Sequence, residues 1–297
     1  MSVTHDDSEI EASRAPLLDH LIELRRRLII CALALVVGFL LCFAFSKQIY
    51  IILLQPFEAG ASLLRAQKAG GRHGPFDLLL VLTHLKAAPA AVGELKLVFT
   101  APLEFFFTKV KLAVFGAIVV TFPVLAWQLY RFVAPGLYRR ERRAFLPFLI
   151  ASPVLFTMGA ALVYFVMLPF VLWFSLNQQI VDAGHVSVQL LPKVSDYLSL
   201  VTTLLLAFGL CFQLPVVLSL MGLAGLVNAR LLRSGRRYAI VGVFVVAAVL
   251  TPPDPISMVS LALPICLLYE VSIWCVALIE GRREKEDAVA AQEVSTE

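Results

Sequence analysis

Charged residues are scarce in this chain of 297 residues. Asp, Glu, Lys and Arg make up 15% of it, whereas a soluble domain carries about 25%, and hydrophobic residues make up 60%. The mean hydropathy is +0.86. This composition predicts a membrane protein with several spans, and the net charge of +4 matters less than where the charges lie.

Motifs that hold phosphates, zinc or a nucleophilic serine are also missing, because the sequence contains no GxxxxGK[ST], HExxH or GxSxG pattern. The first residues are acidic and polar, so we predict no cleavable signal peptide. The cysteines have no metal-ligand spacing and lie in apolar runs, which predicts small buried side chains rather than disulfides. They are Cys31, Cys42, Cys211, Cys266 and Cys275. We expect no cofactor, no metal and no nucleic-acid partner.

The apolar runs predict an all-α polytopic membrane protein with six spans. Residues 28–46 are free of charge over 19 positions, which is enough to cross a hydrocarbon core of about 30 Å. The charge-free run 144–181 is better explained by one long helix with prolines than by two spans. The expected spans are residues 28–46, 105–130, 145–176, 197–221, 238–252 and 256–279.

The remaining segments are expected to lie outside the membrane. Residues 1–16 and 280–297 are charged and predict disordered tails flanking a membrane domain at 17–279. Residues 49–57 are apolar but short, and we expect a re-entrant or surface element that Pro56 ends. Residues 58–98 predict a long external loop, with a small surface helix at 76–85.

The basic residues indicate the orientation. Four Lys or Arg lie in the N-terminal segment, five at 127–143, four at 230–237 and three in the C-terminal tail, which is 16 of 25. Cytoplasmic loops of membrane proteins carry this excess of positive charge. Six spans with both termini in the cytoplasm satisfy the rule. Spans five and six then form a short hairpin, because 16 residues of helix reach only about 24 Å.

Two carboxylates, Glu23 in HLIELRRR and Glu141 in LYRRERR, lie in these arginine-rich cytoplasmic segments. The simpler interpretation is that each neutralises its neighbouring arginines. The alternative is a binding site for a cationic peptide, since arginine–carboxylate pairs are strong and directional.

Polar residues in or beside the later spans form a second candidate set. Gln213, Asp254 and Glu270 are the members, and ionisable groups within a membrane are candidates for function. The simpler interpretation is an interhelical hydrogen bond, particularly for Gln213. Asp254, between prolines in TPPDP, could equally be a turn residue.

Several motifs in order give the chain a resemblance to a known family. HLIELRRRL, TAPLEFFFTKVK, FPVLAWQLYRFVAPGLYRRERR and VLTPPDPISMVSLALPICLLYE resemble TatC, the largest subunit of the twin-arginine protein translocase. The resemblance covers residues 17–279. It implies a concave, cup-like six-helix bundle in the inner (plasma) membrane. It also implies export of folded proteins driven by the proton-motive force, and no covalent chemistry.

The resemblance implies roles and partners as well. Glu23 and Glu141 fall on the carboxylates that contact the signal arginines, with Arg25 and Phe132 in the same two motifs. The partners implied are twin-arginine signal peptides, single-span TatA-like and TatB-like proteins, the lipid bilayer and further copies of the chain. Gln213 stands where many relatives carry glutamate. It would then act through hydrogen bonding, with Asp254 and Glu270, in docking partner helices.

Two other classes of protein remain open at this point. A proton-coupled small-solute transporter would use Glu270 and Asp254, but such folds often show internal repeats and none is visible here. A membrane enzyme would need a nucleophile–base pair or a metal cluster among the intramembrane polar residues, and neither pattern is present.

Overall fold

The computed structural model describes residues 4–68, 80, 101–133, 139–177, 180–183, 186–188, 193–250 and 255–295. Its elements in chain order are α1 Thr4–Ala44, α2 Ser46–Lys68, α4 Glu104–Val133, α5 Arg139–Leu162, the π-helix Val163–Met167, α6 Leu168–Asn177, β1 Ile180–Ala183, β2 Val186–Val188, α7 Val194–Cys211, α8 Leu214–Leu223, α9 Ala229–Leu250 and α10 Pro255–Ser295. The strands form one short antiparallel hairpin. The fold is otherwise helical, as the composition predicts. The expected surface helix at 76–85 lies outside the described residues.

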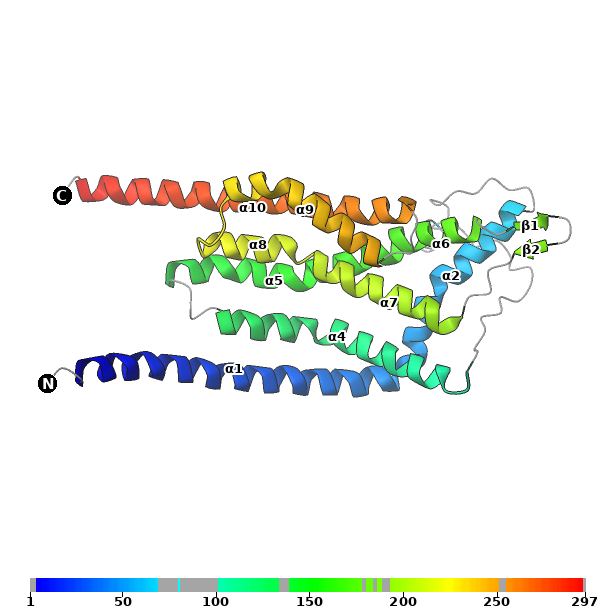
Figure 1. The fold of residues 1–297 in the computed structure, drawn as a ribbon, viewed down its shortest axis with the longest axis horizontal. Coiled ribbons are helices and arrows are strands. Elements are labelled where there is room, and N and C mark those ends of the chain that lie inside the picture. The colour runs from blue at the N-terminus through cyan, green and yellow to red at the C-terminus, as the bar shows by residue number, and fades with distance from the viewer. Residues whose placement is uncertain are drawn as a thin grey trace.

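The long helices run along one axis, with both ends of the chain at the same end of the molecule (Figure 1). α1 packs on α4, α5 packs on α7, and α10 packs on α8 and α9. Arg131, Arg139–Arg143 and Arg230–Arg237 belong to the ends of α4, α5 and α9 on the side of the termini, and Arg25–Arg27 lie within α1 on the same side of the bundle (Figure 1). Charges far apart in sequence therefore gather at one end of the bundle.

Among the described residues, five helical stretches are long and apolar enough to cross a membrane. They are Leu21–Ala44, Glu104–Phe132, Phe148–Met167, Val194–Leu223 and Met258–Arg282. The fifth predicted span lies in α9, whose first nine residues include four arginines, so the apolar part covers only 238–250. That is about 20 Å of helix, short of a 30 Å core. The structure therefore supports five spans by length and composition, and six remains our prediction.

The third predicted span is one continuous run of helix made of α5, the π-helix and α6, in agreement with the expected long helix at 145–176. The fourth is broken. α7 ends at Cys211 and α8 begins at Leu214, with Pro215 in its first turn. The N–H groups in the first turn of a helix have no partner within that helix, so a proline there removes no helical hydrogen bond. The break between α7 and α8 therefore falls where a proline is tolerated best.

The two tails differ from expectation. α1 is helical from Thr4, and α10 continues to Ser295. Each tail extends an existing helix, so no new nucleus is needed. The C-terminal one is rich in Ala, Glu, Lys and Arg, which favour helix. The acidic residues 6, 7, 9 and 11 lie near the N-terminus of α1, where negative charge stabilises a helix.

Pro56 does not end the element at 49–57, and this expectation is wrong. α2 passes through Pro56 and continues to Lys68. Because proline has no N–H, the carbonyl of Ile52 loses its helical partner. The Tyr164 hydroxyl donates to Ile52 O (2.8 Å), and the Tyr197 hydroxyl donates to Leu53 O (2.9 Å). Side chains from two other helices thus satisfy the kinked backbone, as apolar surroundings require.

This arrangement also places α2 in the core. Leu53, Leu54 and Phe57 are buried, and the Phe57 and Tyr197 rings lie 5.2 Å apart. Tyr164 itself belongs to the π-helix, the irregular turn between α5 and α6. α2 is therefore an internal element that fixes the end of the bundle opposite the termini, rather than a surface element.

We expect Tyr197→Phe to destabilise the fold by about 1–3 kcal/mol, because it removes a buried hydrogen bond between α7 and the carbonyl of Leu53. Tyr164→Phe should cost less, since Tyr164 is only half-buried. The measurement is the midpoint of thermal unfolding in detergent. Tyr238→Phe is the matched control, because Tyr238 is exposed on α9. Equal midpoints for all three variants would contradict the role given to the hydroxyls.

Candidate functional site

The Glu23 carboxylate is held by an arginine of its own helix. Arg27, one turn further along α1, donates from Nε to Glu23 Oε1 (3.1 Å) and forms an ion pair with the same oxygen through its terminal nitrogen. Arg27 also reaches Gln128 Oε1 on α4 (3.4 Å). The neutralising role foreseen for Glu23 is thus observed, with Arg27 as the partner. The two helices are joined through that arginine.

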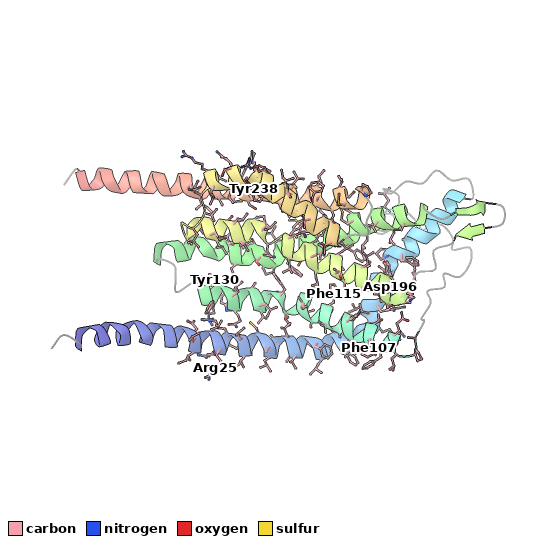
Figure 2. All side chains as sticks on the ribbon, viewed as in Figure 1. Arg25, Phe107, Phe115, Tyr130, Asp196 and Tyr238 are labelled. Carbon is pink, nitrogen blue, oxygen red and sulfur yellow. The ribbon has the colours of Figure 1, made fainter. Side chains whose placement is uncertain are left out.

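Glu23 nonetheless keeps one third of its side chain exposed (34%), whereas Arg27 is 17% exposed. Arg25 is exposed on the same helix. Figure 2 shows Arg25 on the side of α1 away from α4. A spacing of two residues turns side chains to nearly opposite faces of a helix, so Arg25 does not lie with Glu23 against α4.

The last turns of α4 complete this end of the site. Arg131 stacks over the Trp127 ring, with its guanidinium carbon 5.8 Å from the ring centroid. Tyr130, labelled in Figure 2, lies 5.9 Å from Trp127 between ring centroids. Phe132 is half-buried in the same turns. Glu141 is placed only as a backbone position in the first turn of α5, and its side chain lies outside the described part of the structure.

A groove of about 570 Å³ begins beside these residues. α4 supplies one wall through Phe122, Leu125, Leu129 and Tyr130, and α8 supplies the other through Val216, Leu220 and Met221. Phe148, Leu149 and Ser152 of α5 lie between them. Apart from the Tyr130, Ser152 and Gln213 side chains, the lining is apolar. The groove therefore suits an apolar helix or chain segment.

Gln213 lies in this groove and ties two of its walls together. Its Nε2 donates to the carbonyl oxygen of Ser152 (2.9 Å), and its Oε1 accepts from the Ser152 hydroxyl (2.8 Å). The interhelical hydrogen bond foreseen for Gln213 is thus observed. Because a carboxylate has no donor, only a protonated glutamate at this position could make both bonds.

Gln213→Leu should destabilise the protein by about 1–3 kcal/mol, since the buried Ser152 hydroxyl then loses its partner and the Ser152 carbonyl loses its second donor. Ser152→Ala removes the hydroxyl, so the double variant should cost less than the sum of the two single variants. The measurement is chemical unfolding of the four proteins in mixed micelles. Strict additivity would show that the pair contributes nothing to the bundle.

Glu270 belongs to a different part of the molecule. It pairs with Arg236 of α9 (2.7 Å), and the neighbouring Tyr269 hydroxyl donates to Leu232 O (2.9 Å). Both ionic side chains are nearly half exposed. Glu270 lines a smaller groove between α9 and α10. The structure therefore does not bring Gln213 and Glu270 to one place, and Asp254 lies outside the described residues.

Asn228 and Glu280 fix the start of α9. The backbone N–H of Leu231 donates to Asn228 Oδ1 (2.7 Å), and that of Ala229 donates to Glu280 Oε1 (3.0 Å). These side chains satisfy N–H groups that a helix start leaves free. Gly225, with φ 70°, makes the turn before them.

Several of these partners were not foreseen from the sequence. Arg27 could have been, because a glutamate and an arginine four residues apart meet on a helix surface. Gln128, Ser152 and Arg236 belong to other helices, and sequence spacing gives no signal for them. Among the described residues, no cluster of His, Cys, Asp and Glu could hold a metal ion.

The fold and site define a helical membrane protein with several spans, whose cationic helix ends surround carboxylates and an apolar groove. The chain belongs to the TatC family, described as Sec-independent protein translocase protein (TatC), whose model matches residues 19–264. This family is a membrane subunit of a protein translocase and is not enzymatic. The expected resemblance is confirmed, and protein transport replaces the solute-transporter alternative.

Relatives and a solved structure agree with this assignment. The TatC of Magnetococcus marinus is 42% identical over 275 residues, covering 93% of this chain and 89% of that protein. The TatC of Escherichia coli K12 is 33% identical over 273 residues, covering 92% of each. A crystal structure of the twin arginine translocase receptor TatC matches with a TM-score of 0.65 and 32% identity, covering 86% of this chain and 97% of that one.

Proposed function

We propose that this chain is the receptor subunit of a twin-arginine translocase in the inner membrane, with six spans and both termini in the cytoplasm. It recognises the arginine pair of signal peptides on folded precursors through Glu23 and Glu141. It recruits TatA-like and TatB-like single-span partners and further copies of itself. The proton-motive force drives export.

One observation carries the proposal: the Glu23 carboxylate of α1 is linked through Arg27 to the last turns of α4, and the same turns line an apolar groove. Arg27, bonded to Glu23, also bonds Gln128, while Tyr130 and Leu129 line the groove. A peptide with arginines followed by an apolar segment matches this order of charge and apolar surface. The orientation is supported by the gathering of basic helix ends on the side of the termini (Figure 1).

The signal arginines would meet a carboxylate that is already engaged. About a third of the Glu23 side chain is exposed, and a carboxylate can accept from more than one guanidinium. Arg25 and Phe132 shape the surroundings in this proposal. Gln213, Asp254 and Glu270 form the docking region for partner helices, through two separate parts of the bundle.

Site-specific photocrosslinking tests the receptor function. A probe at Leu24 reports on the carboxylate end, a probe at Leu129 reports on the groove, and a probe at Trp274 on exposed α10 is the control. The ligands are a twin-arginine signal peptide and the same peptide with two lysines. We expect crosslinks from Leu24 and Leu129 with the arginine peptide alone, and their loss in Glu23→Ala.

The receptor proposal fails if both peptides crosslink equally, or if Trp274 crosslinks as strongly as the two site probes. Equal crosslinking would leave Glu23 as a partner of Arg27 only. Crosslinks from Leu24 without any from Leu129 would keep the carboxylate in its role and remove the groove from the proposal.

A further inference from the structure

A second groove lies at the end of the bundle opposite the termini. The end of α1, the start of α2 and the first turns of α4 meet there, and Figure 2 marks this end of α4 by Phe107. The groove has a volume of about 350 Å³. It has no part in the recognition of arginines proposed above, because it lies at the other end of α4.

Most of the surface of this groove is apolar, and part of its lining is exposed on the outside of the bundle. Ile51 and Phe105 are exposed, Leu112 is buried at the base, and Tyr50 meets Phe105 edge-on with ring centroids 6.4 Å apart. Such a groove, open to the membrane, has the dimensions and the chemistry to take part of an acyl chain.

Two lysines, Lys47 and Lys109, belong to the same lining. The Lys109 ammonium lies 5.0 Å from the centroid of the Phe43 ring on α1. This contact holds the charge against the bundle instead of leaving it to extend freely into water. Lysines on this side of the membrane are not explained by the bias of basic residues toward cytoplasmic loops.

The charge of these lysines is not matched by a carboxylate within the lining of the groove. None of the residues lining it is acidic. Glu104, one residue before Phe105, accepts from the backbone N–H of Ala101 (3.1 Å) and from the Ser195 hydroxyl of α7. Thr108 is likewise engaged, since its hydroxyl donates to Glu104 O (2.8 Å). Lys47 and Lys109 are therefore cations of a groove whose lining contains no carboxylate.

We propose that this groove binds one anionic phospholipid, with its phosphate between Lys47 and Lys109 and an acyl chain against Ile51, Phe105 and Leu112. The two features are complementary to the two parts of such a lipid: cations at the membrane interface and an apolar channel beside them. The lipid would fill the angle between α1, α2 and α4 and stabilise their junction.

Native mass spectrometry of the purified full chain tests this proposal. The protein is exposed to equal amounts of phosphatidylglycerol and phosphatidylcholine with identical acyl chains. We expect a retained phosphatidylglycerol on the parent, and a roughly tenfold loss of that preference in Lys47→Gln/Lys109→Gln. Lys111→Gln is the matched control, because Lys111 is an exposed lysine of the same helix that does not line the groove.

Two further arms make the result decisive. Glycerophosphoglycerol, which has the headgroup without acyl chains, should bind far more weakly if the groove takes the tail. Phosphatidylglycerol should also raise the unfolding temperature of the parent and of Lys111→Gln more than that of the double variant. An unchanged preference in the double variant, or an equal loss in Lys111→Gln, would overturn the proposal in favour of general attraction to the bilayer surface.

Discussion

Replacing Gly209 by valine should destabilise the bundle by about 3 kcal/mol, the upper end of what overpacking costs in a filled core. A Cβ at Gly209 would lie 2.5 Å from the Phe156 ring, closer than any real contact. Phe156 is buried and stacks on Phe122 of α4, with ring centroids 4.1 Å apart. The ring therefore has no free space to move into.

The contact is reciprocal, which makes the effect larger. A Cβ at Gly159 of α5 would lie 2.8 Å from the carbonyl oxygen of Phe208 and 2.8 Å from the Phe212 ring. A glycine of α5 thus packs against a phenylalanine at the end of α7, and a glycine of α7 packs against a phenylalanine of α5. Small residues of this kind let membrane helices approach closely. Because α5 also lines the groove, a displaced α5 should lose ligand binding along with stability.

The measurement for Gly209→Val is the yield of monodisperse protein together with its unfolding midpoint in detergent. Gly242→Ala is the matched control, because a Cβ at Gly242 of α9 would meet nothing within 4 Å. That variant should be neutral or gain up to about 1 kcal/mol from better helix propensity. A Gly209→Val protein with the parent midpoint would show that α5 and α7 can separate without cost.

The sequence was sufficient for the helical class, because charge-free length and hydrophobicity act over whole segments. It did not predict α2 correctly. Pro56 normally ends a helix, and its tolerance depends on hydroxyls from Tyr164 and Tyr197, more than 100 residues away. No local pattern contains that information.

The same limit applies to the candidate site. Glu23 was expected to neutralise neighbouring arginines or bind a ligand, and Glu270 to make an interhelical hydrogen bond or act in function; both form ion pairs in the structure, with partners that differ in kind. Arg27 lies one turn from Glu23, within reach of a helical rule, whereas Arg236 meets Glu270 only because α9 folds back on α10. Gln213 and Glu270 were grouped because both are polar residues in or beside the later spans. The structure places them in separate parts of the bundle.

Reversing the charge of Glu23 should abolish recognition of twin-arginine peptides, with at least a hundredfold weaker binding. Loss of one partner of a desolvated, hydrogen-bonded charge pair in an interface costs about 2–5 kcal/mol, and the reversed charge adds repulsion of the signal arginines. The same result is expected for Glu141→Lys. The measurement is peptide affinity in nanodiscs, followed by export of a folded precursor.

Loss of binding alone does not separate recognition from structure, since Glu23→Lys also breaks the pair with Arg27 and, through it, the link to Gln128. The charge swap Glu23→Arg/Arg27→Glu separates the two. It rebuilds an ion pair four residues apart on α1, so the free energy of unfolding should return to within about 0.5 kcal/mol of that of the parent protein. The carboxylate, however, then lies one turn further along the helix.

If Glu23 recognises the signal arginines, binding stays lost in the charge swap although the fold is restored. If Glu23 serves only to neutralise Arg27, the swap restores binding together with stability, and the receptor role of this carboxylate is refuted.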